Sequence, residues 1–164
     1  MDLVTAGRTT AEGLLAQALP RRWTHVMAVS VKASEVSMIL DEVERPLLVA
    51  AAWLHDIGYA PELIDTGLHA LDGARWLRQH GYGKRVAALV AHHSCALFEA
   101  EERGLADVLR TDFVDEETAL RDALWYADMT TGPDGQNLDV LERLAEIRTR
   151  YGPRAPAKSS GDAE

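Results

Sequence analysis

The sequence has little of what extracellular, membrane-spanning or nucleic-acid-binding proteins need. It contains a single cysteine, Cys95, so the chain cannot form an internal disulfide, and we expect a reducing, cytoplasmic setting. Lys and Arg number 17 against 26 Asp and Glu, and this net charge of -9 argues against binding to duplex nucleic acid. The main apolar run, residues 47–54, is far shorter than the roughly 20 residues that a membrane helix needs. The first ten residues have neither a basic start nor a long apolar stretch, so we expect no signal peptide.

Alternating strand patterns and internal repeats are also missing, and helical signals dominate. The sequence therefore predicts an all-α fold, a compact bundle of six or seven helices. Thr9 or Thr10 is the expected N-cap of the first helix. Pro20 and Pro46 suit the first turns of the second and third helices. The third helix is apolar on nearly every face, so we expect it to be central and to end at Gly58.

The second half of the chain adds shorter helical segments and a charged stretch. Residues 98–117 are charged and broken by Gly104, which is typical either of a lid over a pocket or of a surface helix. We expect residues 1–151 to form one helical domain and residues 152–164, rich in Pro, Gly and Ser, to be a disordered tail. Further helices are predicted over residues 68–79, 84–94, 118–130 and 138–147.

Six histidines are the main candidates for chemistry, although each of them alone has an ordinary interpretation. A single helical histidine is more often a hydrogen-bonded core or surface residue than a ligand. His80 fits that interpretation, because a cation near a helix C-terminus interacts favourably with the helix dipole. The six are His25, His55, His69, His80, His92 and His93.

Two aspartates, Asp56 and Asp128, lie in apolar segments that offer them no partner of opposite charge. The segments AAWLHDIGYA and LWYADMTTG contain neither Lys nor Arg. Burying either carboxylate unpaired would cost several kcal/mol, and a divalent cation would compensate both charges at once. A mixed set of histidine and aspartate ligands suits Mn²⁺, Fe²⁺ or Zn²⁺ and not Ca²⁺. The pattern therefore predicts a site for a transition metal.

The order His25, His55-Asp56 and Asp128 resembles the HD superfamily of metal-dependent phosphohydrolases. LHDIG matches the central signature of that superfamily, and the resemblance covers residues 21–133. HALDGARWL and VAHHS resemble segments of HD proteins that hold two metals. Those subfamilies include bacterial diadenosine tetraphosphate hydrolases and the HD-GYP cyclic-dinucleotide phosphodiesterases. The resemblance implies that the helical domain is of the HD type.

The resemblance also implies a binuclear centre in which one carboxylate, that of Asp56, bridges two metal ions. The second ion would be held by His69 and by either His92 or His93, and the register of the dipeptide HS favours His93. The ligands implied for the first ion are His25, His55, Asp56 and Asp128.

The function implied by the resemblance is hydrolysis of a nucleotide or another small phosphate ester or anhydride by a metal-activated water. Asp56 and Arg22 are the implied catalytic residues. Arg22 lies one turn before the first histidine of the set and is the first candidate to clamp the phosphate, with Arg21 second. Cyclic-dinucleotide cleavage is not expected, because Tyr59 follows HDIG where many HD-GYP proteins carry lysine.

Two alternatives from other functional classes stay open at this point. One branch of the HD superfamily uses the same kind of ligand set to hold a di-iron centre that activates O₂ on a small polyol or phosphonate. A sensing domain could also keep the fold without turnover, although the complete ligand set argues against it. We further expect that the protein can form a homodimer.

Overall fold

The computed structural model describes residues 1–151, and over that range the chain forms helices and one isolated β-bridge between Thr131 and Asn137. The all-α class is confirmed, but the predicted count of six or seven helices is too low, because nine α-helices lie in that range. The predicted tail, residues 152–164, lies outside the described residues. The α-helices are α1 (Leu3–Leu15), α2 (Pro20–Val36), α3 (Arg45–Leu54), α4 (His69–Gln79), α5 (Lys84–Ala91), α6 (Ala96–Glu102), α7 (Ala106–Asp112), α8 (Ala119–Met129) and α9 (Val140–Tyr151).

Three short 3₁₀ helices complete the description, and two of them follow α3. They are η1 (Ser37–Ile39), η2 (Ile57–Tyr59) and η3 (Pro61–Leu63). The charged stretch that was expected to be a lid or one surface helix forms α6 and α7, each of seven residues. Gly104 separates them with a φ of 69°, a left-handed conformation that glycine adopts without strain. None of the described helices is both long and apolar enough to cross a membrane.

Helix starts follow local chemistry, with one departure from the prediction. α2 begins at Pro20 and α3 carries Pro46 in its first turn, as predicted. The N-cap of α1 is Asp2, whose carboxylate accepts a hydrogen bond from the Thr5 backbone N–H at 3.0 Å. Thr9 and Thr10, the expected caps, therefore lie within the helix and not at its start.

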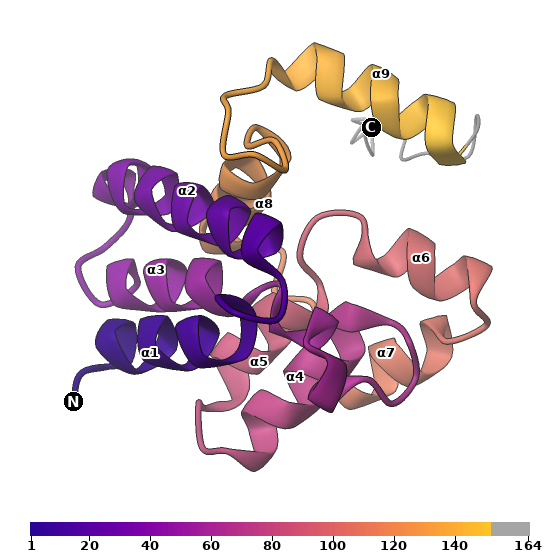
Figure 1. Ribbon diagram of the computed structural model, residues 1–164, viewed down its shortest axis with the longest axis horizontal. Coiled ribbons are helices and arrows are strands. Elements are labelled where there is room, and N and C mark those ends of the chain that lie inside the picture. Colours follow the sequence, from indigo (N-terminus) through magenta and orange to yellow (C-terminus); the bar gives the residue numbers. More distant parts are fainter. Residues whose placement is uncertain (152–164) are drawn as a thin grey trace, which may run out of the picture.

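The central position predicted for the third helix is confirmed. α3 lies between α1 and α2 and packs against both (Figure 1). Its buried residues include Ala50, Ala51 and Ala52, whose small side chains let neighbouring helices approach closely. The helix ends at Leu54, earlier than the predicted Gly58. Its C-terminus thus delivers the pair His55-Asp56 directly into the interior of the bundle.

Gly58 has a packing role instead of ending the helix. A Cβ atom on this residue would lie 1.9 Å from the His69 carbonyl oxygen and 2.7 Å from the Gly73 backbone nitrogen. Only a residue without a side chain lets η2 lie directly on the first turn of α4. This contact brings Asp56 close to His69, 13 residues further along the chain.

Asp72 fixes the loop that leads into α4. Its buried carboxylate accepts hydrogen bonds from the backbone N–H groups of Asp65 at 3.1 Å, Thr66 at 3.0 Å and Gly67 at 3.0 Å. The Thr66 hydroxyl donates a fourth bond to it at 2.7 Å. The position of His69, two residues after this loop, is therefore set by a carboxylate within α4 itself.

Candidate metal centre

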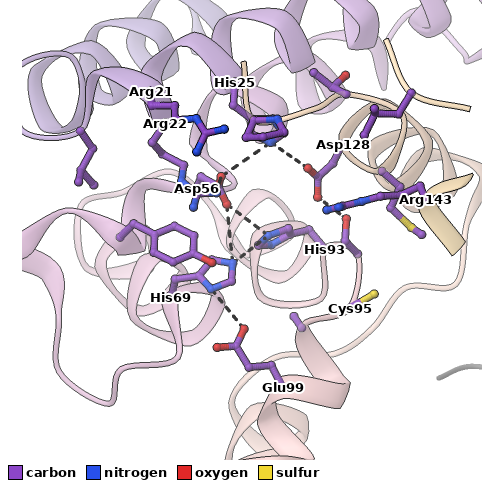
Figure 2. Close-up of a pocket in the computed structure, with 18 of the residues that line it drawn as sticks. Arg21, Arg22, His25, Asp56, His69, His93, Cys95, Glu99, Asp128 and Arg143 are labelled. Carbon is purple, nitrogen blue, oxygen red and sulfur yellow. Dashed lines mark hydrogen bonds and ion pairs between the residues drawn. The ribbon is translucent and has the colours of Figure 1, made fainter. Parts of the chain in front are cut away.

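A cleft of about 710 Å³ is lined by residues from α2, α4, α6, α8 and α9. Histidine and aspartate side chains from separate helices point toward one another at its floor (Figure 2). They form two groups in which the potential ligand atoms lie within 4.8 Å of one another. The groups are His25, His55 and Asp128, and Asp56, His69 and His93.

The ligands of the first group come from three different helices. His25 lies within α2, His55 caps α3 and Asp128 lies near the end of α8. His25 Nε2 lies 3.0 Å from Asp128 Oδ1, and His55 Nε2 lies 3.6 Å from the same oxygen. The two Nε2 atoms are 3.4 Å apart. Three ligand atoms therefore meet at one point.

The second group shares its carboxylate with the first. His69 Nε2 and His93 Nε2 lie 3.2 Å apart, and each is 3.7 Å from Asp56 Oδ1. The other oxygen of Asp56, Oδ2, faces the first group at 3.4 Å from His55 Nε2. Asp56 thus presents a different oxygen to each group, which is the arrangement that a bridging ligand requires.

Backbone carbonyls fix the tautomers of three of these histidines. A carbonyl oxygen can only accept, so each bonded Nδ1 carries the proton, and Nε2 of the neutral ring presents a lone pair. The three bonds run from His25 to Gly132 at 3.0 Å, from His55 to Ala52 at 2.8 Å and from His93 to Val90 at 2.6 Å.

Lone pairs that face each other at 3.4 Å repel, and a shared cation turns that repulsion into attraction. Imidazole nitrogens and carboxylate oxygens are ligands that first-row transition metals accept, and hydrogen bonds to the outer nitrogen are typical of metal-binding histidines. The donor set therefore fits a divalent transition metal.

The ionisation of the two carboxylates and of His69 also suits metal binding. Burial raises the pKa of the Asp56 carboxyl, but His55, His93 and Arg22 outweigh it and hold that pKa well below the usual range. Burial also raises the pKa of the Asp128 carboxyl, but nearby histidines, His55 above all, outweigh this effect and hold that pKa well below the usual range. Burial, reinforced by the neighbouring His93, lowers the pKa of His69 to about 3. Both carboxylates are thus ionised, and His69 is neutral at pH 7.

Two histidines lie outside both groups. His92 Nε2 donates to the Phe113 carbonyl at 2.8 Å, and the His92 carbonyl accepts from Trp125 Nε1 at 2.8 Å. Of the adjacent pair, the structure therefore places His93 at the site and turns His92 away from it. His80 caps α4, stacks on the Trp76 ring at 3.7 Å and donates from Nδ1 to the Trp76 carbonyl at 2.8 Å.

The two arginines predicted to bind phosphate have different surroundings. Arg22 lines the cleft, donates to Asp56 Oδ2 at 2.8 Å and lies over the Tyr59 ring at 4.0 Å. Arg21 lies at the rim with its side chain 69% exposed, and it forms an ion pair with Asp134 at 2.7 Å. Of these two arginines, Arg22 is therefore the one whose charge lies beside the two ligand groups.

Three further residues at the cleft were not predicted. Ser94 Oγ donates to Asp128 Oδ2, and Ser94 adopts a φ of 47° to do so. Glu99 of α6 lies 3.5 Å from His69 Nδ1. Arg143 of α9 also lines the cleft, and its side chain points toward Asp128 (Figure 2). Ser94 follows the histidine pair directly, so its place in VAHHS was a usable signal. No spacing in the sequence connects Glu99 or Arg143 with the ligands.

Comparison with known proteins gives one match. A family model described as HD domain matches residues 22–145, a range that contains every residue of the two ligand groups. No curated protein and no solved structure matches the chain.

Proposed function

The chain belongs to the HD domain family, and on that premise we propose that it is a metal-dependent phosphohydrolase. We propose as its substrate a nucleotide or another small phosphate ester or anhydride. The observation that carries the proposal is the pair of ligand groups joined through the two oxygens of Asp56. A buried, ionised carboxylate with lone pairs on both sides is a costly arrangement that cations make favourable.

Two divalent ions, of Mn²⁺, Fe²⁺ or Zn²⁺, are proposed to bind here. Asp56 would contribute to both positions, one oxygen to each. Such ions lower the pKa of a coordinated water and polarise a phosphoryl oxygen. The remaining ligands are His25, His55 and Asp128 for the first position, and His69 and His93 for the second.

The side chains of the protein bind and orient the substrate. Arg22 supplies a planar set of N–H donors inside the cleft, which suits a phosphoryl group. Tyr59 supports the Arg22 guanidinium from one face, at 4.0 Å. Ser94 occupies one oxygen of Asp128 and leaves the other to face His25 and His55. Arg22 is paired with Asp56 at 2.8 Å, so the positive charge that attracts an anionic substrate would come from the bound ions together with Arg22, although the chain carries a net charge of -9.

The test is a hydrolysis screen on protein reconstituted with one divalent ion at a time, which follows both free phosphate and nucleotide products because symmetrical cleavage of a dinucleoside polyphosphate releases no phosphate. Substrates are nucleoside mono-, di- and triphosphates, dinucleoside polyphosphates and simple phosphomonoesters. We expect release that depends on the added ion, is lost in His55→Ala and is retained in His80→Ala. His80 is the matched control because its imidazole stacks on Trp76, away from the ligand groups.

Three outcomes would count against this function. Oxygen uptake on addition of a polyol or phosphonate, with no hydrolysis of any phosphate ester or anhydride, would favour the di-iron oxygenase. Metal binding without turnover of any substrate would favour a sensing domain. Phosphate release that is equal in His55→Ala and in the unaltered protein would place the chemistry elsewhere.

A further inference from the structure

His69 differs from the other three histidines of the centre in what its outer nitrogen contacts. The Nδ1 atoms of His25, His55 and His93 all bond to backbone carbonyls. His69 Nδ1 is buried and, among the described residues, has no hydrogen-bond partner. Glu99 Oε2 lies 3.5 Å from it. The orientation of this ring is therefore left to a side chain.

Glu99 is itself held so that one oxygen remains for His69. Arg103, one turn further along the chain, donates from Nε to Glu99 Oε1 at 3.0 Å and also contacts that oxygen from Nη2 at 2.8 Å. The other oxygen, Oε2, points into the cleft toward the imidazole (Figure 2). The Glu99 side chain is 21% exposed, so water screens it less than a surface carboxylate.

Stacking holds the face of the His69 ring, whereas Nδ1 at its edge makes no hydrogen bond among the described residues. The Tyr59 ring stacks on it with centroids 4.0 Å apart and planes 14° from parallel. Stacking fixes the plane of the ring but does not distinguish its two orientations related by a 180° turn about χ2, and a hydrogen bond at Nδ1 selects one of them. At 3.5 Å the contact with Glu99 is longer than an ideal N–H···O bond of about 2.9 Å, so a movement of about half an ångström completes it.

We propose that Glu99 is a positioning residue that sets the metal affinity of the second ligand group by accepting the Nδ1–H of His69. The inference rests on the proposed function, because it takes the second group to hold an ion. A carboxylate in this place fixes the tautomer of the histidine and raises the basicity of Nε2. The first group, whose histidines are held by backbone carbonyls, does not depend on Glu99.

The competing explanation is that Glu99 serves only its ion pair with Arg103. An ion pair four residues apart near a helix surface contributes little to stability and nothing to metal binding. The two explanations differ in whether the metal affinity changes when the Glu99 carboxylate is removed.

The experiment is a titration of the full chain, freed of metal, with Co²⁺ followed by visible absorption and with Mn²⁺ followed by calorimetry. In Glu99→Ala we expect the second equivalent to bind about 10–100-fold more weakly and the first to bind unchanged. Glu99→Gln keeps an acceptor oxygen and should lose less affinity. Glu102→Gln removes an exposed carboxylate from the same helix and should bind both equivalents normally.

The outcomes separate this inference from the function on which it rests. If Glu99→Ala binds both equivalents normally while His69→Ala loses one, the inference is wrong and the binuclear site stands. If His69→Ala binds as many ions as the unaltered protein, the second group holds no ion and both ideas are wrong. If both equivalents weaken equally in Glu99→Ala and Glu99→Gln, Glu99 supports the fold and not His69. Circular dichroism of both variants establishes that they are folded.

Discussion

The two ligand groups are built from different kinds of structure. In the first, ligands from α2, α8 and the C-terminal end of α3 meet, and backbone carbonyls orient both imidazoles. In the second, a backbone carbonyl orients His93, which follows α5, but no backbone carbonyl holds His69, the first residue of α4. Side chains, those of Tyr59, Asp72 and Glu99, set the position of His69. Helix packing thus determines the first group, whereas the second depends on individual contacts that single substitutions can remove.

The largest effect is expected when the residue that both ligand groups share is removed, because both groups then lose metal. In Asp56→Ala we expect activity to be lost completely and metal content to fall in both groups, because each group loses one carboxylate oxygen. The helical content should stay near normal. Elemental analysis, phosphate release and far-ultraviolet circular dichroism measure the three quantities. Full activity at the normal metal content would contradict the assignment of the site.

A second substitution should damage the second group more than the first. In Gly58→Ala the new methyl group would meet the His69 carbonyl oxygen, since an ideal Cβ lies 1.9 Å from it. We expect the free energy of unfolding to fall by roughly 3 kcal/mol and α4 to move away from Asp56. Urea denaturation measures the stability, and metal titration measures the second equivalent.

The control for that variant is Gly13→Ala, because nothing lies within 4 Å of an added Cβ at Gly13 in α1. Alanine inside an exposed part of a helix should stabilise the protein by about 0.5–1 kcal/mol relative to glycine. Equal stability of the two alanine variants would show that the contact between η2 and α4 is not tight.

A third substitution tests the two groups separately through the number of metal ions that the protein binds. We expect the unaltered protein to bind two equivalents and His69→Ala to bind one, because His25, His55 and Asp128 remain in place. Titration with Mn²⁺ or Fe²⁺ under anaerobic conditions gives the number directly. One equivalent of the same affinity in both proteins would leave a mononuclear centre, and two equivalents of unchanged affinity in His69→Ala would place the second ion at a different site.

The smallest effects are expected for the histidines outside both groups. In His92→Ala the Phe113 carbonyl loses its donor, so we expect about 1 kcal/mol of lost stability with normal metal affinity. In His80→Ala we expect almost no change in turnover. A loss of turnover in either variant as large as that in His55→Ala would show that the histidines have been divided wrongly.

Local signals in the sequence were sufficient for most of the fold. Pro20 and Pro46 marked the first turns of α2 and α3, because proline fits a helix only where its missing N–H is not needed. The start of α1 was misplaced, because Thr9 and Thr10 resemble a cap as well as Asp2 does. Which of them acts as the cap depends on how far the helix extends, and packing against α3 decides that.

The site was predictable to the extent that its residues lie within short motifs. The order of the ligands predicted the family, which the match over residues 22–145 confirms. The choice between His92 and His93 depended on how the chain turns after α5, which the left-handed conformation of Ser94 reflects. The proximity of Glu99 to His69 could not be predicted from the sequence, since the two lie 30 residues apart and only the packing of α6 against the cleft brings them together.

The lone pairs that converge on Asp56 and Asp128 also affect how the protein folds. Packing imidazole nitrogens and carboxylates against one another costs free energy that the unfolded chain does not carry. An ion that binds only the folded chain offsets this cost, by about 2.7 kcal/mol when its free concentration is 100 times its dissociation constant. The melting temperature should therefore rise with the concentration of free metal and fall in the presence of a chelator. Through these lone pairs, the fraction of chain that is folded depends on the metal supply around it.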